Sequence, residues 1–204
     1  MRSEPNNVMI KRSVDEAATP GTFELREFDK AAVAKEGIAF DTHVVVEPVT
    51  EGTESKYLKK ASLMLNLPGW SAWEVMCDEG VTGGGTDSAP SPLGYLSIGV
   101  ACCLLTHMVE AINRWKLNIR SVRVEQRISF HSTYNFSPTF DPEDNVGRTK
   151  SLETNVVIDS DEPQEQLQRL VRLSEQACFA ANAFVTQVAA STQVVVNGEA
   201  LSVD

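Results

Sequence analysis

The feature that most constrains the fold of this sequence is one long apolar stretch near its middle. The segment Tyr95 to Val109 is mostly apolar and is interrupted by Ser97, Thr106 and His107. It is shorter than the roughly 20 apolar residues that a bilayer-spanning helix needs. A helix that is apolar on nearly all sides has to be covered by other parts of the protein. We therefore expect a buried core helix.

The residues around this stretch predict where the helix begins and ends. Ser91 suits the N-cap, and Pro92 suits the first helical position. The preceding loop contains Gly83–Gly85, whose glycines favour irregular structure. The helix can then continue to Arg114 or Lys116.

Strand patterns lie on both sides of this helix. A second helix is predicted after the polar segment Asp159–Pro163, because Leu170, Ser174 and Cys178 recur at helical spacing on its apolar face. This order of elements favours an α+β fold over a βαβ alternation. The predicted strands cover residues 43–47, 57–67, 70–76, 119–130, 149–158 and 193–196.

Length and composition predict one principal domain. A chain of 204 residues with 42% hydrophobic residues can form one sizeable core. Residues 1–40 are mixed and polar, so we interpret them as an N-terminal arm, and residues 41–204 as the domain.

The charge of the chain limits its partners. A formal net charge of -10 argues against binding to nucleic acid or to an anionic membrane, because both need a basic surface. The first twenty residues lack the apolar stretch of a signal peptide, so we expect a cytoplasmic protein.

The four cysteines are Cys77, Cys102, Cys103 and Cys178, and no two of them have C-x-x-C spacing. They predict individual thiols rather than a disulfide framework or a zinc site. The three histidines are scattered, which disfavours a metal site. The glycine run Gly83–Gly85 lacks the lysine of a phosphate-binding loop, and we expect no cofactor.

Two motifs resemble those of the OsmC/Ohr family. The first combines Gly84-Gly85, Ser91-Pro92 and a helix with Cys103 about three turns in. The second is the stretch from Cys178 to Ala183, which is similar to the family's second cysteine motif. The resemblance covers roughly residues 60–196.

The resemblance implies an α+β fold in which antiparallel sheets wrap around two long helices, and an intertwined homodimer. It also implies a peroxidase that reduces organic hydroperoxides, with Cys103 attacking the peroxide and Cys178 resolving the product. Two thiols suit this chemistry because the sulfenic acid formed in the first step can condense with a second thiol before it is oxidised further. A dithiol would be the reductant.

The sequence departs from the peroxidase branches at two positions. Leu93 stands where those branches have a glutamate, and Pro68–Trp70 stands where they have an arginine. The loop Gly84–Pro92 instead resembles a broader OsmC-like branch. Whether the chain is an enzyme therefore stays open at this point.

Other residues could complete the site or change its function. His107 lies one helical turn after Cys103 and is a weaker catalytic candidate. Trp70, Trp73 and Tyr95 could line a pocket for an apolar molecule. The alternatives to the peroxidase are a non-catalytic binding protein with an apolar molecule in its dimer cleft, and a dimer with inert cysteines.

Overall fold

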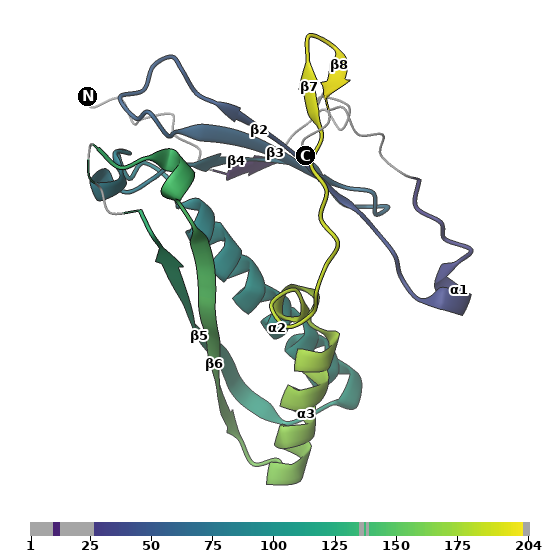
Figure 1. Ribbon diagram of the computed structural model, residues 1–204. Helices are drawn as coiled ribbons and strands as arrows, with labels where there is room; N and C mark the ends of the chain where they lie inside the picture. The colour runs from purple at the N-terminus through teal and green to yellow at the C-terminus, as the bar shows by residue number, and fades with distance from the viewer. Residues whose placement is uncertain (1–9, 13–26, 135–136, 138, 202–204) are drawn as a thin grey trace, which may run out of the picture. The chain divides into compact units, whose positions relative to one another are not determined.

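A computed structural model describes residues 10–12, 27–134, 137 and 139–201 (Figure 1). The chain divides into two compact units, which meet in sequence between Tyr95 and Leu96. We describe each unit by itself. The division into an arm of residues 1–40 and a domain of residues 41–204 stays a prediction.

The N-terminal unit contains a four-stranded antiparallel sheet in the order β1-β4-β3-β2. His43 of β2 pairs with Met64 of β3, and Ala61 of β3 pairs with Val75 of β4. The elements of this unit are β1 (Ile10–Arg12), α1 (Val33–Glu36), β2 (Thr42–Pro48), β3 (Lys59–Leu65), β4 (Trp73–Cys77) and the 3-10 helix η1 (Val81–Gly83).

The C-terminal unit is organised around two helices and one long strand pair, visible in Figure 1 as the green and teal part of the ribbon. The strands β5 and β6 are antiparallel and of equal length. The elements after η1 are α2 (Pro92–Trp115), β5 (Ile119–Ser132), η2 (Pro142–Asp144), β6 (Gly147–Ser160), α3 (Gln164–Ala177), α4 (Phe179–Asn182), β7 (Val194–Val196) and β8 (Glu199–Leu201).

The core of the C-terminal unit forms where α2, α3 and the β5–β6 pair meet. Alternation along β5 places Val122 and Val124 against this core, whereas Arg123 is exposed. The fully buried members of the core are Leu104, Met108, Leu170 and Cys178. The α+β class with antiparallel sheets, predicted from the sequence, is confirmed.

The start of α2 also agrees with the sequence. The hydroxyl of Ser91 accepts a hydrogen bond of 3.2 Å from the backbone N–H of Gly94, as an N-cap serine should. Pro92 is the first residue of the helix. The segment from the glycine loop into α2 is therefore built as its sequence predicts.

The burial of α2 differs from the expectation of a fully buried helix. Only Val100, Leu104 and Met108 are buried, whereas Leu96 and Ile98 are exposed. Within the described residues, α2 is the one helix long and apolar enough to cross a membrane, although core helices of soluble proteins pass the same test. One chain therefore covers a single stripe of this apolar helix.

One further expectation is corrected by the structure, and one strand is added to those predicted. The second helix ends at Ala177, so Cys178 lies just beyond it and not on its surface. The sheet of the N-terminal unit gains β1, which falls in the predicted arm and pairs with β4. A three-residue strand such as β1 is too short to produce a clear sequence pattern.

Candidate functional site: two neighbouring thiols

The C-terminal unit brings Cys103 and Cys178 into contact. Cys103 is half-buried in the middle of α2, and Cys178 is fully buried between α3 and α4. Cys103 packs against the buried cluster that contains Cys178, and it contributes to the raised pKa of the Cys178 thiol. Two cysteines 75 positions apart in the sequence therefore share one site.

The backbone around Cys178 explains how its thiol reaches this position. The residue has φ -74° and ψ 105°, which interrupts the helical path between α3 and α4. Its sulfur then accepts a hydrogen bond of 3.4 Å from the backbone N–H of Ala181, so Cys178 acts as the N-cap of α4.

The surroundings of Cys178 favour its protonated form. Burial raises the pKa of this thiol, and this effect exceeds the opposing hydrogen bond from the Ala181 amide. The neighbouring Cys103 raises the pKa further through its hydrogen bond and charge. None of the groups that act on the pKa of Cys178 is a cation, and only the backbone amides of Ala181 and Ala180 lower it.

His107 packs beside this site. Its ring centroid lies 5.8 Å from that of Phe179, with an angle of 56° between the two rings. Phe179 follows Cys178 directly, so His107 reaches the segment that carries the second thiol. The observed geometry is aromatic packing, and a catalytic role for His107 stays a prediction.

The other two cysteines lie in different settings. Cys102 is exposed on α2, and its carbonyl accepts a hydrogen bond of 2.9 Å from Thr106. Cys77 is buried at the end of β4, where burial raises its pKa, Lys59 opposes the shift, and Glu79 and Asp78 add to it.

The three aromatic residues predicted to line a pocket lie in the N-terminal unit, whereas both thiols lie in the C-terminal unit. Trp70 and Trp73 are exposed, and the Tyr95 hydroxyl donates a hydrogen bond of 2.6 Å to the Met76 carbonyl. A shared role of these aromatic residues and the thiols therefore stays a prediction.

The loop before α2 is organised by a buried carboxylate, Asp78. Its side chain is completely buried and accepts hydrogen bonds from the hydroxyls of Ser55, Thr86 and Ser88, at 2.5, 2.9 and 2.9 Å. The backbone amides of Thr86 and Ser88 donate to the same carboxylate, at 3.1 and 3.2 Å. No sequence pattern identifies Asp78 as the group that holds this loop in place.

Burial and hydrogen bonding act in opposite directions on this carboxylate. Burial raises the pKa of Asp78, but the hydrogen bonds from Ser55, the Glu79 and Ser88 amides and Thr86 outweigh it. The pKa therefore lies well below its usual value. Asp78 is a charged buried group that is stabilised by neutral donors.

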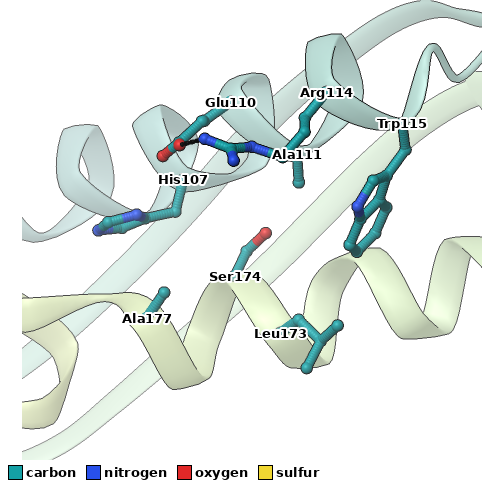
Figure 2. Close-up of a pocket in the computed structure, with 8 residues that line it drawn as sticks. All are labelled: His107, Glu110, Ala111, Arg114, Trp115, Leu173, Ser174 and Ala177. Carbon is teal, nitrogen blue, oxygen red and sulfur yellow. Dashed lines mark hydrogen bonds and ion pairs between the residues drawn. The ribbon is translucent and has the colours of Figure 1, made fainter. Parts of the chain in front are cut away.

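A cavity of about 170 Å³ lies between α2 and α3 (Figure 2). His107, Glu110, Arg114 and Trp115 line it from α2, and Ser174 lines it from α3. Sequence analysis considered only His107 among these as a site residue. Helical spacing placed Ser174 on an apolar face, and nothing in the sequence shows which residues of the two helices meet.

Among the described residues, no three His, Cys, Asp or Glu side chains gather in a way that could hold a metal ion. The chemistry that the described groups offer is therefore that of the two thiols, the buried carboxylate and the polar groups of the α2–α3 cavity.

The family model described as OsmC-like protein matches residues 85–193, which is just over half of the chain. The chain belongs to the OsmC-like family. The matched segment of this OsmC-like chain contains Gly85, Cys103 and Cys178, three of the positions on which the sequence resemblance rested. Among curated proteins, none matches the sequence.

Several solved structures are similar to this OsmC-like chain. An OsmC-like hydroperoxide resistance protein from Jannaschia sp. CCS1 is 18% identical, with a TM-score of 0.49 over 80% of this chain and 98% of the other. An OsmC-like protein of unknown function from Vibrio cholerae is 14% identical, with a TM-score of 0.45 over 70% and 92% of the two chains.

An organic hydroperoxide resistance protein from Legionella pneumophila is also 14% identical, with a TM-score of 0.38 over 70% and 88% of the two chains. Likenesses at these identities and TM-scores say nothing about the activity of this OsmC-like chain.

Proposed function

We propose that this OsmC-like protein is a thiol peroxidase that reduces organic hydroperoxides. Cys103 is the attacking thiol, and Cys178 is the resolving thiol. The observation that carries this proposal is the packing of Cys103 against the buried cluster that contains Cys178, a residue 75 positions later in the sequence. Two cysteines can form a disulfide without a large backbone movement only if they already lie next to each other.

The proposed reaction has two chemical steps and one regeneration step. The Cys103 thiolate attacks the outer peroxide oxygen, the O–O bond breaks, and the alkoxide leaves as an alcohol after taking up a proton. Cys103 is then a sulfenic acid. The sulfur of Cys178 attacks it, releasing water and forming a disulfide. An external dithiol reduces this disulfide and restores both thiols.

The geometry suits the order of these steps. Cys103 is half-buried, so a peroxide can reach it, whereas Cys178 is fully buried and has a raised pKa. A protonated, covered thiol does not compete for the peroxide. It becomes useful only after Cys103 has been oxidised.

A second candidate function is a non-catalytic binding protein. The exposed Leu93, at the position of the family glutamate, and the lack of a cation acting on Cys178 favour it. In that case the thiols pack in the core, and an apolar molecule occupies the dimer cleft. Co-purified apolar ligand in native mass spectra would support this function.

We also propose that the protein is a homodimer. Leu93, Leu96, Ile98 and Val109 of α2 are exposed in the single chain. Burying one such side chain contributes about 1.5–3 kcal/mol, so a second copy that covers them would stabilise both chains. Sedimentation equilibrium measures this directly, and a monomer at micromolar concentration would contradict it.

Cytoplasmic localisation is part of the same proposal. The formal net charge of -10 supports it, because an acidic surface does not bind anionic membranes. Fractionation of the producing cells tests it, and recovery in the membrane fraction would point to α2 as a membrane helix.

The peroxidase is tested with the reduced full-length protein, cumene hydroperoxide and dithiothreitol. We expect turnover in the wild type, none in Cys103→Ser, and unchanged turnover in the control Cys102→Ser, because Cys102 lies on a different part of the helix surface. Cys178→Ser should accumulate a Cys103 sulfenic acid, which dimedone traps for mass spectrometry.

The decisive outcomes are distinct. If the wild-type protein consumes no hydroperoxide, the proposed peroxidase activity is wrong and the binding function is favoured. Turnover that survives in Cys103→Ser would assign the chemistry to another group. A peroxide-dependent disulfide between Cys103 and Cys178 would establish the resolving step.

A further inference from the structure

The cavity between α2 and α3 contains a polar group that the protein itself does not satisfy. Ser174 is 2% exposed, and its hydroxyl has no hydrogen-bond partner in the described structure. Figure 2 shows the Ser174 hydroxyl pointing from α3 toward α2. A buried hydroxyl without a partner is unfavourable, so a bound polar group there would be stabilised.

The same cavity has a surplus of hydrogen-bond donors. Arg114 carries five N–H donors, and one of its nitrogens binds Glu110 at 2.7 Å. Both side chains of this ion pair are well exposed, and pairs of this kind contribute little to stability. Arg114 can therefore accept a second acidic partner at small cost. Ser174 and His107 supply further donors.

The remaining walls of the cavity are apolar. Trp115 points from α2 toward α3 (Figure 2), and Ala177 and Leu173 also line the cavity. Arg169 stacks on the Trp115 ring at 4.7 Å from its centroid, which fixes the orientation of the ring. The cavity thus combines the unpartnered Ser174 hydroxyl and the further N–H groups of Arg114 with a flat aromatic wall.

We propose that this cavity binds a small carboxylate with a flat apolar body. The carboxylate accepts hydrogen bonds from Arg114 and Ser174, and the apolar body packs against Trp115. A planar carboxylate matches the guanidinium of Arg114, which gives a bidentate, charge-assisted contact. A volume of about 170 Å³ limits the ligand to a small molecule. This site does not depend on the proposed peroxidase, because neither thiol lines it.

Benzoate is the probe, and its neutral counterpart benzyl alcohol is the control. Both are titrated into the reduced full-length protein by calorimetry. We expect benzoate to bind and benzyl alcohol to bind at least about tenfold more weakly, because it lacks the charge that pairs with Arg114. Equal affinity for the two probes, or no benzoate binding at millimolar concentration, would overturn the proposal.

Arginine variants test which cation holds the carboxylate. Arg114→Gln should weaken benzoate binding about tenfold, and Arg114→Lys should retain part of the affinity. The matched control is Arg123→Gln, because Arg123 on β5 is similarly exposed and pairs with Glu125. Equal losses in the Gln variants at 114 and 123 would mean that only the overall charge matters, which would contradict the site.

Two further variants test the remaining parts of the site. Ser174→Ala should weaken benzoate binding several-fold, because it removes a buried donor. Glu110→Gln should strengthen binding, because it frees Arg114 and removes a like charge. Unchanged binding in Ser174→Ala together with weaker binding in Glu110→Gln would show that the carboxylate does not lie here.

Discussion

Asp78 in the N-terminal unit and Ser174 in the C-terminal unit are both almost completely buried polar side chains, but their hydrogen bonding is opposite. Asp78 accepts hydrogen bonds from Ser55, Thr86 and Ser88. Ser174 has no partner among the described residues. One group is therefore a structural centre of its loop, and the other is an unfilled position in a cavity.

The difference shows how burial alone misleads as a sign of function. Burying a polar group costs free energy unless hydrogen bonds replace its water. The protein provides these bonds at Asp78, so that group needs no ligand. It provides none at Ser174, so a ligand could supply them. The predictions below test whether this contrast between the two groups is real.

The largest expected effect is the loss of stability in Asp78→Asn. An amide keeps one acceptor oxygen but turns its NH2 group toward the donors that now bind the carboxylate. We expect a loss of about 2–3 kcal/mol in the free energy of unfolding, measured by urea denaturation. The matched control is Asp87→Asn, because Asp87 is exposed in the same loop and asparagine tolerates its φ of 55°. Equal losses of stability in both variants would show that Asp78 does not hold the loop in place.

Gly85→Ala tests the loop from its backbone. A Cβ atom on Gly85 would lie 2.0 Å from the carbonyl oxygen of Glu79, so the backbone has to shift. We expect Gly85→Ala to lower the free energy of unfolding by about 2 kcal/mol. Gly83→Ala is the control, because its Cβ would meet only the Glu79 side chain, at 3.7 Å. A neutral Gly85→Ala in thermal unfolding would show that the loop is loosely held.

Acid should reproduce part of the Asp78 effect. The pKa of Asp78 is lowered in the folded protein, so its contribution to stability is present above the unfolded pKa of about 4. That contribution is lost as the pH falls below about 4 toward the folded pKa. The difference in the free energy of unfolding between wild type and Asp78→Asn should therefore narrow as the pH falls from about 5 to about 2.5, the range in which an ordinary aspartate becomes protonated. A constant gap would mean that the charge of Asp78 is unimportant.

Much of the fold could be predicted because local patterns decide it. The N-cap Ser91, the following Pro92 and the long apolar run define α2, and strict alternation around Val122 and Val124 defines β5. Sequence motifs also placed Cys103 and Cys178 in one family pattern before their contact was known. These features depend on residues that are close in the sequence.

The other features depend on which segments meet in space. Helical spacing continues through Cys178, and no proline or glycine marks the end of α3 at Ala177. The loop role of Asp78 depends on Ser55, which is 23 positions away. The unpaired state of Ser174 depends on the packing of α3 against α2. A single sequence carries no signal for such tertiary contacts.

The smallest expected effect is a gain of stability in Ser174→Ala. Removing a buried hydroxyl without a partner should stabilise the free protein by about 1 kcal/mol. Alanine also has the higher helix propensity, which alone gives about 0.5 kcal/mol or less. The contrasting control is Ser160→Ala, because the Ser160 hydroxyl donates to the Asn118 carbonyl at 2.9 Å and its loss should destabilise.

The two serine variants therefore have opposite expected signs in the same thermal unfolding experiment. If Ser174→Ala destabilises the protein as Ser160→Ala does, the Ser174 hydroxyl has a partner in solution, such as an ordered water. The contrast with Asp78 would then disappear, and the cavity would lose its unfilled donor. If Ser174→Ala stabilises the free protein and also weakens benzoate binding, the same hydroxyl costs stability and binds the carboxylate, which a purely structural serine would not do.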